Sequence, residues 1–364
     1  MAETDRKQTG LERLAALFEP PGRGRAAGDV RIGLAGGGPL LAPAAAAYSS
    51  LGLKKPPVMY APDTVRPEYA AGPLKDLETV ADFDDFARRV DAVEVFDFPE
   101  GRSEFAIRLL EAGRHVSLQK PFARSMEEAQ ALARAAGRRN AVLRINEYAL
   151  FYEPYIKLKE LIDAKEIGEV CAIRFRSNLA GADGVPWPEL LTDGDCFFHP
   201  AFDRFALAEH LLGGVESVIC YSNRLRPKKG GTAVVGFKYK AAGCYGVFDL
   251  TYAPGTAIRA DCVPCDDQIE VAGTDGIIWA NHFHGKMTEE PWLEVRRGKK
   301  HYTLGIGSDM AVEWKDCLGA SARHFLECAA GRAKPRLSPR AALRALRFQL
   351  AAAEAARTGS EVKV

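Results

Sequence analysis

The first part of the chain alternates short apolar segments with helix-forming segments, and this alternation restricts the possible folds more than any other feature. The apolar segments that we expect to be strands are residues 30–35, 58–61, 92–97, 115–118 and 142–145. The helical segments that we expect are residues 40–51, 84–89, 103–112 and 126–136, the last ending at Gly137. Strands and helices at this spacing predict an α/β fold with a parallel, doubly wound sheet.

The pattern changes after residue 147, where strand-like segments often alternate apolar with polar residues, as half-buried antiparallel strands do. We expect strands at residues 170–177, 215–225, 232–240, 244–252, 268–273, 277–281, 293–296 and 300–304. We expect helices at residues 155–164, 202–212, 321–330 and 339–357. The chain therefore divides into an N-terminal extension (1–28), an α/β domain (29–148) and an α+β domain with one large, mostly antiparallel sheet (149–364).

Composition narrows the class of protein. A length of 364 residues suggests about two domains, and 47% apolar residues can form real cores. The net charge is +1 and no basic run stands out, so we expect neither nucleic acid nor a membrane as a partner. The polar start, MAETDRKQTG, resembles no secretory signal, and the eight scattered cysteines suit a reducing compartment. We expect a cytoplasmic protein.

A glycine-rich turn follows the first predicted strand. Gly36, Gly37 and Gly38 precede a predicted helix, the context in which backbone N–H groups bind a pyrophosphate. Leu41 is large for the third position of such a fingerprint, so a purely structural glycine turn is the alternative. Asp63 follows the second strand, where an acidic residue binds the ribose hydroxyls of NAD. We expect NAD or NADP as cofactor, with NAD slightly favoured because Arg66 could instead meet a 2′-phosphate.

A lysine lies at the carboxyl end of another predicted strand, residues 115–118. It belongs to the sequence Gln119-Lys120-Pro121, and Ser125 with Glu128 then forms a capping box that opens the next helix. Open α/β sheets bind their ligands at this end of the strands. Lys120 is therefore a candidate catalytic residue.

The Gln119-Lys120-Pro121 sequence resembles the Lys-Pro signature of the Gfo/Idh/MocA oxidoreductases, in which Glu-Lys-Pro is usual. The resemblance extends over about residues 29–364. It implies a Rossmann dinucleotide-binding domain, then a substrate-binding domain whose sheet forms a homo-oligomer, a dimer or tetramer. The family usually has Thr-Pro-x-x-x-His after the third strand; here Pro99 is kept and Ser103 replaces the histidine. The resemblance implies that Pro99 and Gln119 lie at the cofactor.

A second family signature, Asp-x-Gly-x-His, is matched with its residue types exchanged. The register is fixed by residues 211–218, which puts His199 at the aspartate position and Asp203 at the histidine position. Residues four apart share a helix face, so both could project toward Lys120. Lys120 would then polarise a substrate oxygen, and His199 with Asp203 would move the proton. The alternative is that His199 caps the helix while Asp203 pairs with Arg204 or another neighbour.

Other residues complete the predicted site. Gln119 carries no charge, so we expect a lower pKa of Lys120 than a glutamate would give, if the two side chains meet. Asn146 and Tyr148 end the last strand of the first domain, where the family has polar substrate contacts, and Trp187 could stack on a sugar. Cys262, Cys265, His282 and His284 have zinc-ligand types, but one Cys-x-x-Cys is a weak signal and we predict no metal.

The predicted function is NAD(P)-dependent hydride transfer between the nicotinamide and a secondary hydroxyl or keto carbon of a sugar, cyclitol or glycoside. Two alternatives stay open. One is a redox-neutral enzyme with tightly bound NAD, which catalyses elimination, glycoside cleavage or epimerisation. The other is a non-catalytic subunit that binds a sugar or the cofactor.

Overall fold

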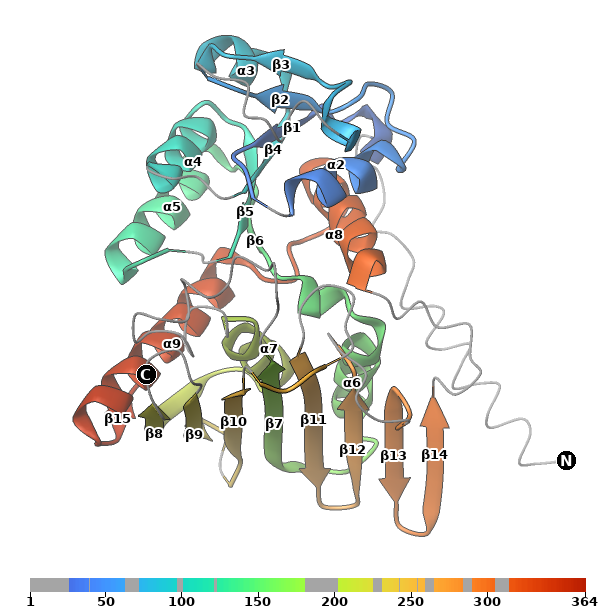
Figure 1. The fold of residues 1–364 in the computed structure, drawn as a ribbon, viewed down its shortest axis with the longest axis vertical. Coiled ribbons are helices and arrows are strands. Elements are labelled where there is room, and N and C mark those ends of the chain that lie inside the picture. Colours follow the sequence, from blue (N-terminus) through green and yellow to red (C-terminus); the bar gives the residue numbers. More distant parts are fainter. Residues whose placement is uncertain are drawn as a thin grey trace, which may run out of the picture.

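The structure is a computed structural model with two sheets, one above the other in Figure 1. It describes residues 26–38, 40–62, 72–96, 101–120, 123–180, 202–224, 231–241, 243–253, 255–258, 265–283, 290–304 and 314–364. The predicted residues Asp63, Pro99, Trp187 and His199 lie outside these ranges, as do Cys262 and His284.

The first sheet is parallel, with the strand order β3-β2-β1-β4-β5-β6. This is the doubly wound order that the sequence predicts, with its reversal between β1 and β4. The strands are β1 (Ile32–Ala35), β2 (Val58–Tyr60), β3 (Glu78–Val80), β4 (Ala92–Val95), β5 (His115–Gln119) and β6 (Leu143–Asn146). The helices are η1 (Ala27–Asp29), α2 (Leu41–Ser49), η3 (Gly72–Leu74), α3 (Phe83–Arg89), α4 (Arg102–Glu111) and α5 (Met126–Arg139).

Helices cover both faces of this sheet. Ile32 and Leu34 of β1 pack in one core with α2 and with α8 (Trp314–Ala329), which comes from far along the chain. Gly33 faces the opposite side, where an added Cβ would lie 2.6 Å from the ring of Phe86 in α3. Gly33 is therefore required for the close packing of α3 on the sheet.

The second sheet has the order β14-β13-β12-β11-β7-β10-β9-β8-β15. Its pairs are antiparallel except for the parallel pair β7 and β10. The strands are β7 (Val170–Ala180), β8 (Val215–Arg224), β9 (Gly231–Tyr239), β10 (Tyr245–Ala253), β11 (Cys265–Gly273), β12 (Gly276–Asn281), β13 (Leu293–Arg297), β14 (Lys300–Leu304) and β15 (Val362–Lys363).

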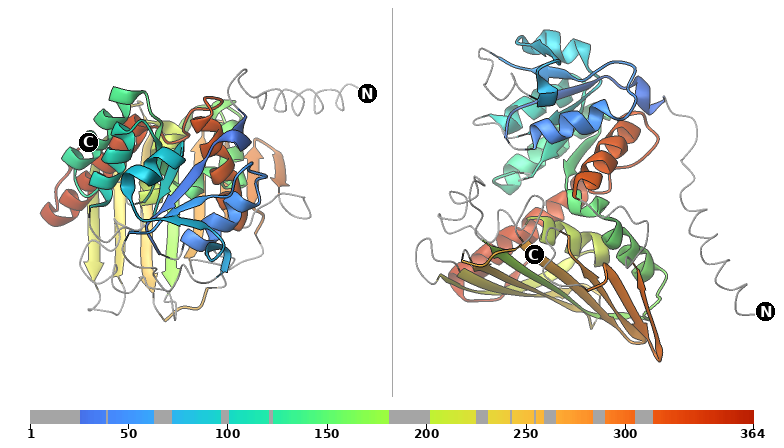
Figure 2. Two further views of the ribbon diagram at one scale, coloured as in Figure 1. Left: turned by 90° about the horizontal axis from the view of Figure 1, so that it is seen from above. Right: turned by 45° about the vertical axis from the view of Figure 1, so that its right-hand side comes forward.

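The remaining helices connect the two sheets. They are η4 (Tyr148–Phe151), α6 (Glu153–Asp163), α7 (Phe202–Leu212) and α9 (Pro339–Thr358). Figure 2 shows α6, α7 and α9 on the face of the second sheet that is turned toward the first sheet. The predicted α/β fold with a second, mostly antiparallel sheet is thus confirmed.

The structure differs from the predicted elements in a few places. Helix α5 does not end at Gly137 but continues to Arg139, and Asn140 ends it in the left-handed conformation with φ 51°. Helix α8 begins at Trp314 rather than at residue 321, and it packs on α2 although the sequence places it with the second sheet. The division at residue 148 stays a prediction, because α8 crosses it. Among the described helices, none is long and apolar enough to span a membrane.

Candidate active site between the two sheets

Lys120 and Asp203 meet between the two sheets. Lys120 directly follows β5, and its Nζ lies 3.2 Å from Oδ2 of Asp203 in the first turn of α7. The Asp203 side chain is 3% exposed and that of Lys120 is 23% exposed. The structure therefore brings together two of the three predicted catalytic residues, and Lys120 keeps access to solvent.

Arg204 extends this pair into the second sheet. Its guanidinium forms ion pairs with Asp203 and with Asp267 of β11. Its Nε and NH2 also donate to Oγ of Ser177 in β7, at 3.0 and 2.9 Å. Burial alone would lower the pKa of Arg204, but Asp203 and Asp267 outweigh burial and raise this pKa well above its usual value. The expected pairing of Asp203 with Arg204 therefore occurs together with its contact to Lys120.

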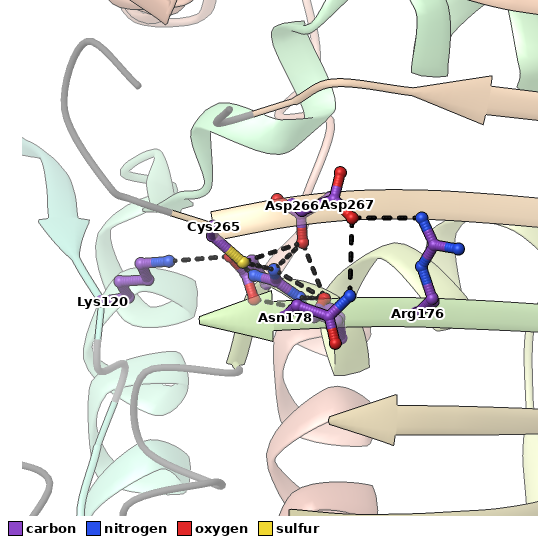
Figure 3. A network of polar contacts seen from close by, with 9 residues as sticks. Lys120, Arg176, Asn178, Cys265, Asp266 and Asp267 are labelled. Atoms are coloured by element: carbon purple, nitrogen blue, oxygen red, sulfur yellow. Dashed lines mark hydrogen bonds and ion pairs between the residues drawn. The ribbon is translucent and has the colours of Figure 1, made fainter. Parts of the chain in front are cut away.

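Further polar contacts lie on β7 and β11, two neighbouring central strands of the second sheet (Figure 3). Arg176 donates to Asp266 at 3.1 Å, and Asn178 donates to the same carboxylate at 3.4 Å. Cys265 Sγ lies 3.3 Å from Asp267 Oδ1, and burial raises the thiol pKa well above its usual value. This thiol is therefore a poor nucleophile. Within the described ranges, no group of three His, Cys, Asp or Glu side chains could hold a metal ion.

Glu147 also belongs to this site. It directly follows β6, is 2% exposed, and accepts a hydrogen bond from the Ala149 N–H at 3.4 Å. Burial raises its pKa to about 7; the charge of Lys120 opposes this rise and that of Asp203 adds to it. The sequence marks residues 146–148 as polar but does not single out Glu147.

The pKa of Lys120 is raised, and the expectation based on Gln119 does not apply, because the Gln119 side chain is bonded elsewhere. Burial lowers this pKa, but the carboxylates of Asp203 and Glu147 outweigh burial. Gln119 is the last residue of β5, and Lys120 lies beyond the strand. The Nε2 of Gln119 donates to Glu94 at 2.6 Å and to the Tyr148 hydroxyl at 2.8 Å. Lys120 is therefore held in its charged form by other carboxylates.

Asn146 and Tyr148 likewise lie in a polar layer beneath α8 rather than in the pocket described below. Asn146 Nδ2 donates to Glu94 at 2.5 Å, and its Oδ1 accepts from Ser321 of α8 at 2.7 Å. Tyr148 is 5% exposed and bonded to Gln119. These polar groups are bonded within the protein, which does not favour the expected substrate contacts.

The glycine turn fits a dinucleotide phosphate. Gly36 and Gly38 have φ of 104° and 93°, values that side chains strongly disfavour, and they join β1 to α2 at the reversal of the strand order. The large Leu41 is accommodated because it is 1% exposed and packs in the core beneath α2 and α8. The chain can therefore bring backbone and the start of α2 close to a pyrophosphate.

A small pocket that is partly open to solvent adjoins the charged cluster. Its lining combines the charged residues Asp203, Arg204 and Asp267 with apolar and aromatic side chains. A few polar groups on an apolar wall are typical of small-molecule sites. The sequence could not indicate Asp267, which is distant from Lys120 along the chain.

Comparison with known sequences supports a cofactor-binding first domain. Residues 31–147 match the model of the Gfo/Idh/MocA oxidoreductase family with an NAD-binding Rossmann fold. The chain is 30% identical over 139 residues to oxidoreductase P35 of Formosa agariphila. This match covers 35% of this chain and 43% of the relative. It is 26% identical over 201 residues to D-apiose dehydrogenase of Rhizobium rhizogenes, covering 54% of each.

A third relative is myo-inositol 2-dehydrogenase of Thermotoga maritima, 27% identical over 202 residues, with 53% of this chain and 57% of the relative covered. These matches span about half the length of the curated relatives.

Solved structures share the whole fold. An oxidoreductase from Agrobacterium radiobacter superposes with a TM-score of 0.77 at 19% identity, over 92% of this chain and 98% of that chain. A levoglucosan dehydrogenase superposes with a TM-score of 0.73 at 19% identity, over 92% and 99%. Residues 31–147 thus resemble the NAD-binding Rossmann domain of the Gfo/Idh/MocA oxidoreductases, and the chain as a whole shares its two-sheet fold with the solved structures.

Proposed function

We propose that this protein is an NAD(P)-dependent oxidoreductase that acts on a secondary hydroxyl or keto group of a sugar, cyclitol or glycoside. The observation that carries the proposal is the contact of Lys120 with Asp203 at the carboxyl end of β5. Lys120 is charged, partly exposed and held beside the pocket. The names of the relatives, D-apiose dehydrogenase and myo-inositol 2-dehydrogenase, support this substrate class.

The chemical role of Lys120 follows from its charge. Its ammonium donates a hydrogen bond to the substrate oxygen and stabilises negative charge there as the carbon–hydrogen bond changes. Asp203 holds the ammonium in place, and Arg204 holds Asp203. His199 with Asp203 takes part in moving the proton. NAD(P), when bound at Gly36–Gly38 with Asp63, Pro99 and Gln119 nearby, supplies the hydride acceptor or donor.

The charge balance of the cluster supports a neutral substrate. Arg204 is paired with Asp203 and Asp267, and Arg176 is paired with Asp266. Since these cations already have carboxylate partners, a phosphate or carboxylate of a substrate would compete with them. A polyhydroxyl compound needs only hydrogen bonds.

We further propose that the protein is cytoplasmic and forms a homo-oligomer, and the open face of the second sheet supports the oligomer. Strands of this sheet expose large apolar side chains, among them Tyr221, Val234 and Tyr245. Tyr221 is 66% exposed. Exposed apolar side chains gathered on one face are typical of association surfaces.

The purified wild-type protein tests the proposed function. It is incubated with neutral sugars and cyclitols, with NAD⁺ or NADP⁺, and the absorbance at 340 nm is followed. We expect reduction of NAD⁺ with at least one neutral polyol and slower reduction of NADP⁺. Turnover without net absorbance change would instead indicate the redox-neutral alternative, and binding without turnover would indicate a non-catalytic subunit.

A further inference from the structure

Glu147 carries a buried carboxylate oxygen for which the described part of the chain offers no hydrogen-bond partner. The residue is 2% exposed, and its Oε1 accepts only a long hydrogen bond from Ala149, at 3.4 Å. Among the described residues, nothing donates a hydrogen bond to its buried Oε2. A buried carboxylate oxygen without a donor is costly, and binding a proton removes the charge that makes it so.

The charged groups around Glu147 leave its carboxylate in excess. The charges of Lys120 at the end of β5 and of Asp203 and Arg204 in α7 act on it. Asp203 already pairs with both cations, and Asp267 pairs with Arg204. The cluster therefore holds more carboxylates than cations. The pKa of Glu147, about 7, agrees with a carboxyl group that gains and loses a proton near neutral pH.

Asp203 is less suited to the same task. It accepts hydrogen bonds from Lys120 Nζ and from the backbone N–H and guanidinium of Arg204. Protonation of Asp203 would weaken these contacts, whereas Glu147 has an oxygen that no described donor occupies.

We propose that Glu147 is the proton reservoir of this site and acts through Lys120. This inference rests on the proposed function. During oxidation, the carbon–hydrogen bond breaks and its electron pair leaves as hydride to the oxidised nicotinamide. The substrate O–H proton passes to Lys120 Nζ, which gives one of its own protons to Glu147 Oε2, and the carbonyl forms. The transfer requires Nζ to move from Asp203 toward Glu147, which the flexible lysine stem allows. Reduction of the ketone reverses each transfer.

The pH profile of Glu147→Gln tests the reservoir. In the wild type, kcat/KM for oxidation rises with pH to a plateau above about 7, because the carboxylate must be free to accept a proton. For ketone reduction it falls above about 7. Glu147→Gln keeps the shape of the side chain but cannot accept this proton. We expect it to lose the limb near pH 7 and to lower kcat at least about 10-fold.

Glu160→Gln is the matched control, because Glu160 is partly buried and paired with Lys157 on α6. We expect the wild-type profile in this variant. If kcat/KM of Glu147→Gln still changes near pH 7 as in the wild type, Glu147 is not the proton reservoir.

Urea unfolding of the cofactor-free protein separates this inference from the proposed function. Native Glu147 keeps its proton up to about pH 7, whereas its usual pKa is 4.5. The native state therefore binds more protons between these values, and the stability contributed by Glu147 is lost as pH rises. The unfolding midpoint of the wild type should fall, relative to Glu147→Gln, between pH 5 and 8.

If the difference in unfolding midpoint between the wild type and Glu147→Gln stays the same from pH 5 to 8, Glu147 does not hold the proton. This conclusion would apply even if the enzyme is active. A wild type that turns over no sugar but shows the midpoint difference would overturn the proposed function, and the relay with it, while leaving the ionisation of Glu147 established.

Discussion

Two polar clusters lie near the carboxyl end of β5. One contains Glu94 and the other contains Glu147, and these two carboxylates differ in the hydrogen bonds that they accept. In the closed cluster, Glu94 of β4 accepts from Tyr48 at 2.5 Å, and from Gln119 and Asn146. In the open cluster, Lys120 keeps access to solvent, and Oε2 of Glu147 has no described donor. Gln119 Oε1 and Arg144 Nη2 of the closed cluster also lack a described partner, but both carboxylate oxygens of Glu94 are bonded. The first arrangement fixes structure, and the second leaves groups able to react.

The closed cluster joins α8 to the first sheet. Arg144 of β6 donates from Nε to Ser117 at 2.9 Å and from NH1 to the carbonyl of Ser321 at 2.8 Å. Its guanidinium also lies 4.8 Å from the ring centroid of Phe325. These contacts explain why a helix from the end of the chain completes the cofactor domain.

Glu94→Ala should give the largest effect on stability and would break the closed cluster. The change leaves three buried donors without their acceptor and opens a cavity. We expect a loss of about 3–5 kcal/mol in the free energy of unfolding, measured with urea. Glu270→Ala is the control, because Glu270 is a half-exposed carboxylate paired with Arg174. A loss of less than about 1 kcal/mol in Glu94→Ala would show that the cluster does not stabilise the fold.

The two clusters should also differ in how they change stability with pH. Next to the closed cluster, the group that titrates is His324 of α8. Burial, together with the charges of Arg144 and Arg336, lowers its pKa to about 4. The unfolded chain binds this proton below about pH 6.5 and the native protein only below about 4, so stability falls as pH falls through this window. This is the opposite sign to that of Glu147.

We expect a loss of about 1–3 kcal/mol from His324 between pH 7 and 4.5. His324→Gln should reduce the slope of unfolding free energy against pH, while His210, whose pKa is also about 4, keeps part of it. An unchanged slope in His324→Gln would contradict the assignment.

The sequence predicts Lys120 and Asp203 for the proposed site, but it does not predict the side chains that surround them. The strand alternation and the turn at Gly36–Gly38 predict the first sheet, because local patterns decide both. Lys120 follows from its position at a strand end. Glu94 reads as part of an apolar strand, and only the packing of α8 shows that its carboxylate is buried and bonded.

The direction of each side chain explains two further differences. Gln119 and Lys120 are adjacent in sequence, but the Gln119 side chain is bonded to Glu94 whereas Lys120 pairs with Asp203. Asp267 reaches Arg204 only because β11 pairs with β7 in the second sheet. Such long-range pairing is not encoded in any local pattern.

The turnover of Lys120→Ala tests the central claim most directly. Lys157→Ala is the matched control, because Lys157 is also a partly buried lysine with a carboxylate partner, 28% exposed and 2.9 Å from Glu160. On a polyol that the wild type oxidises, we expect Lys120→Ala to lower kcat at least about 100-fold and Lys157→Ala to stay within about twofold of the wild type. Wild-type turnover in a folded Lys120→Ala variant would contradict the assignment of the active site to the end of β5.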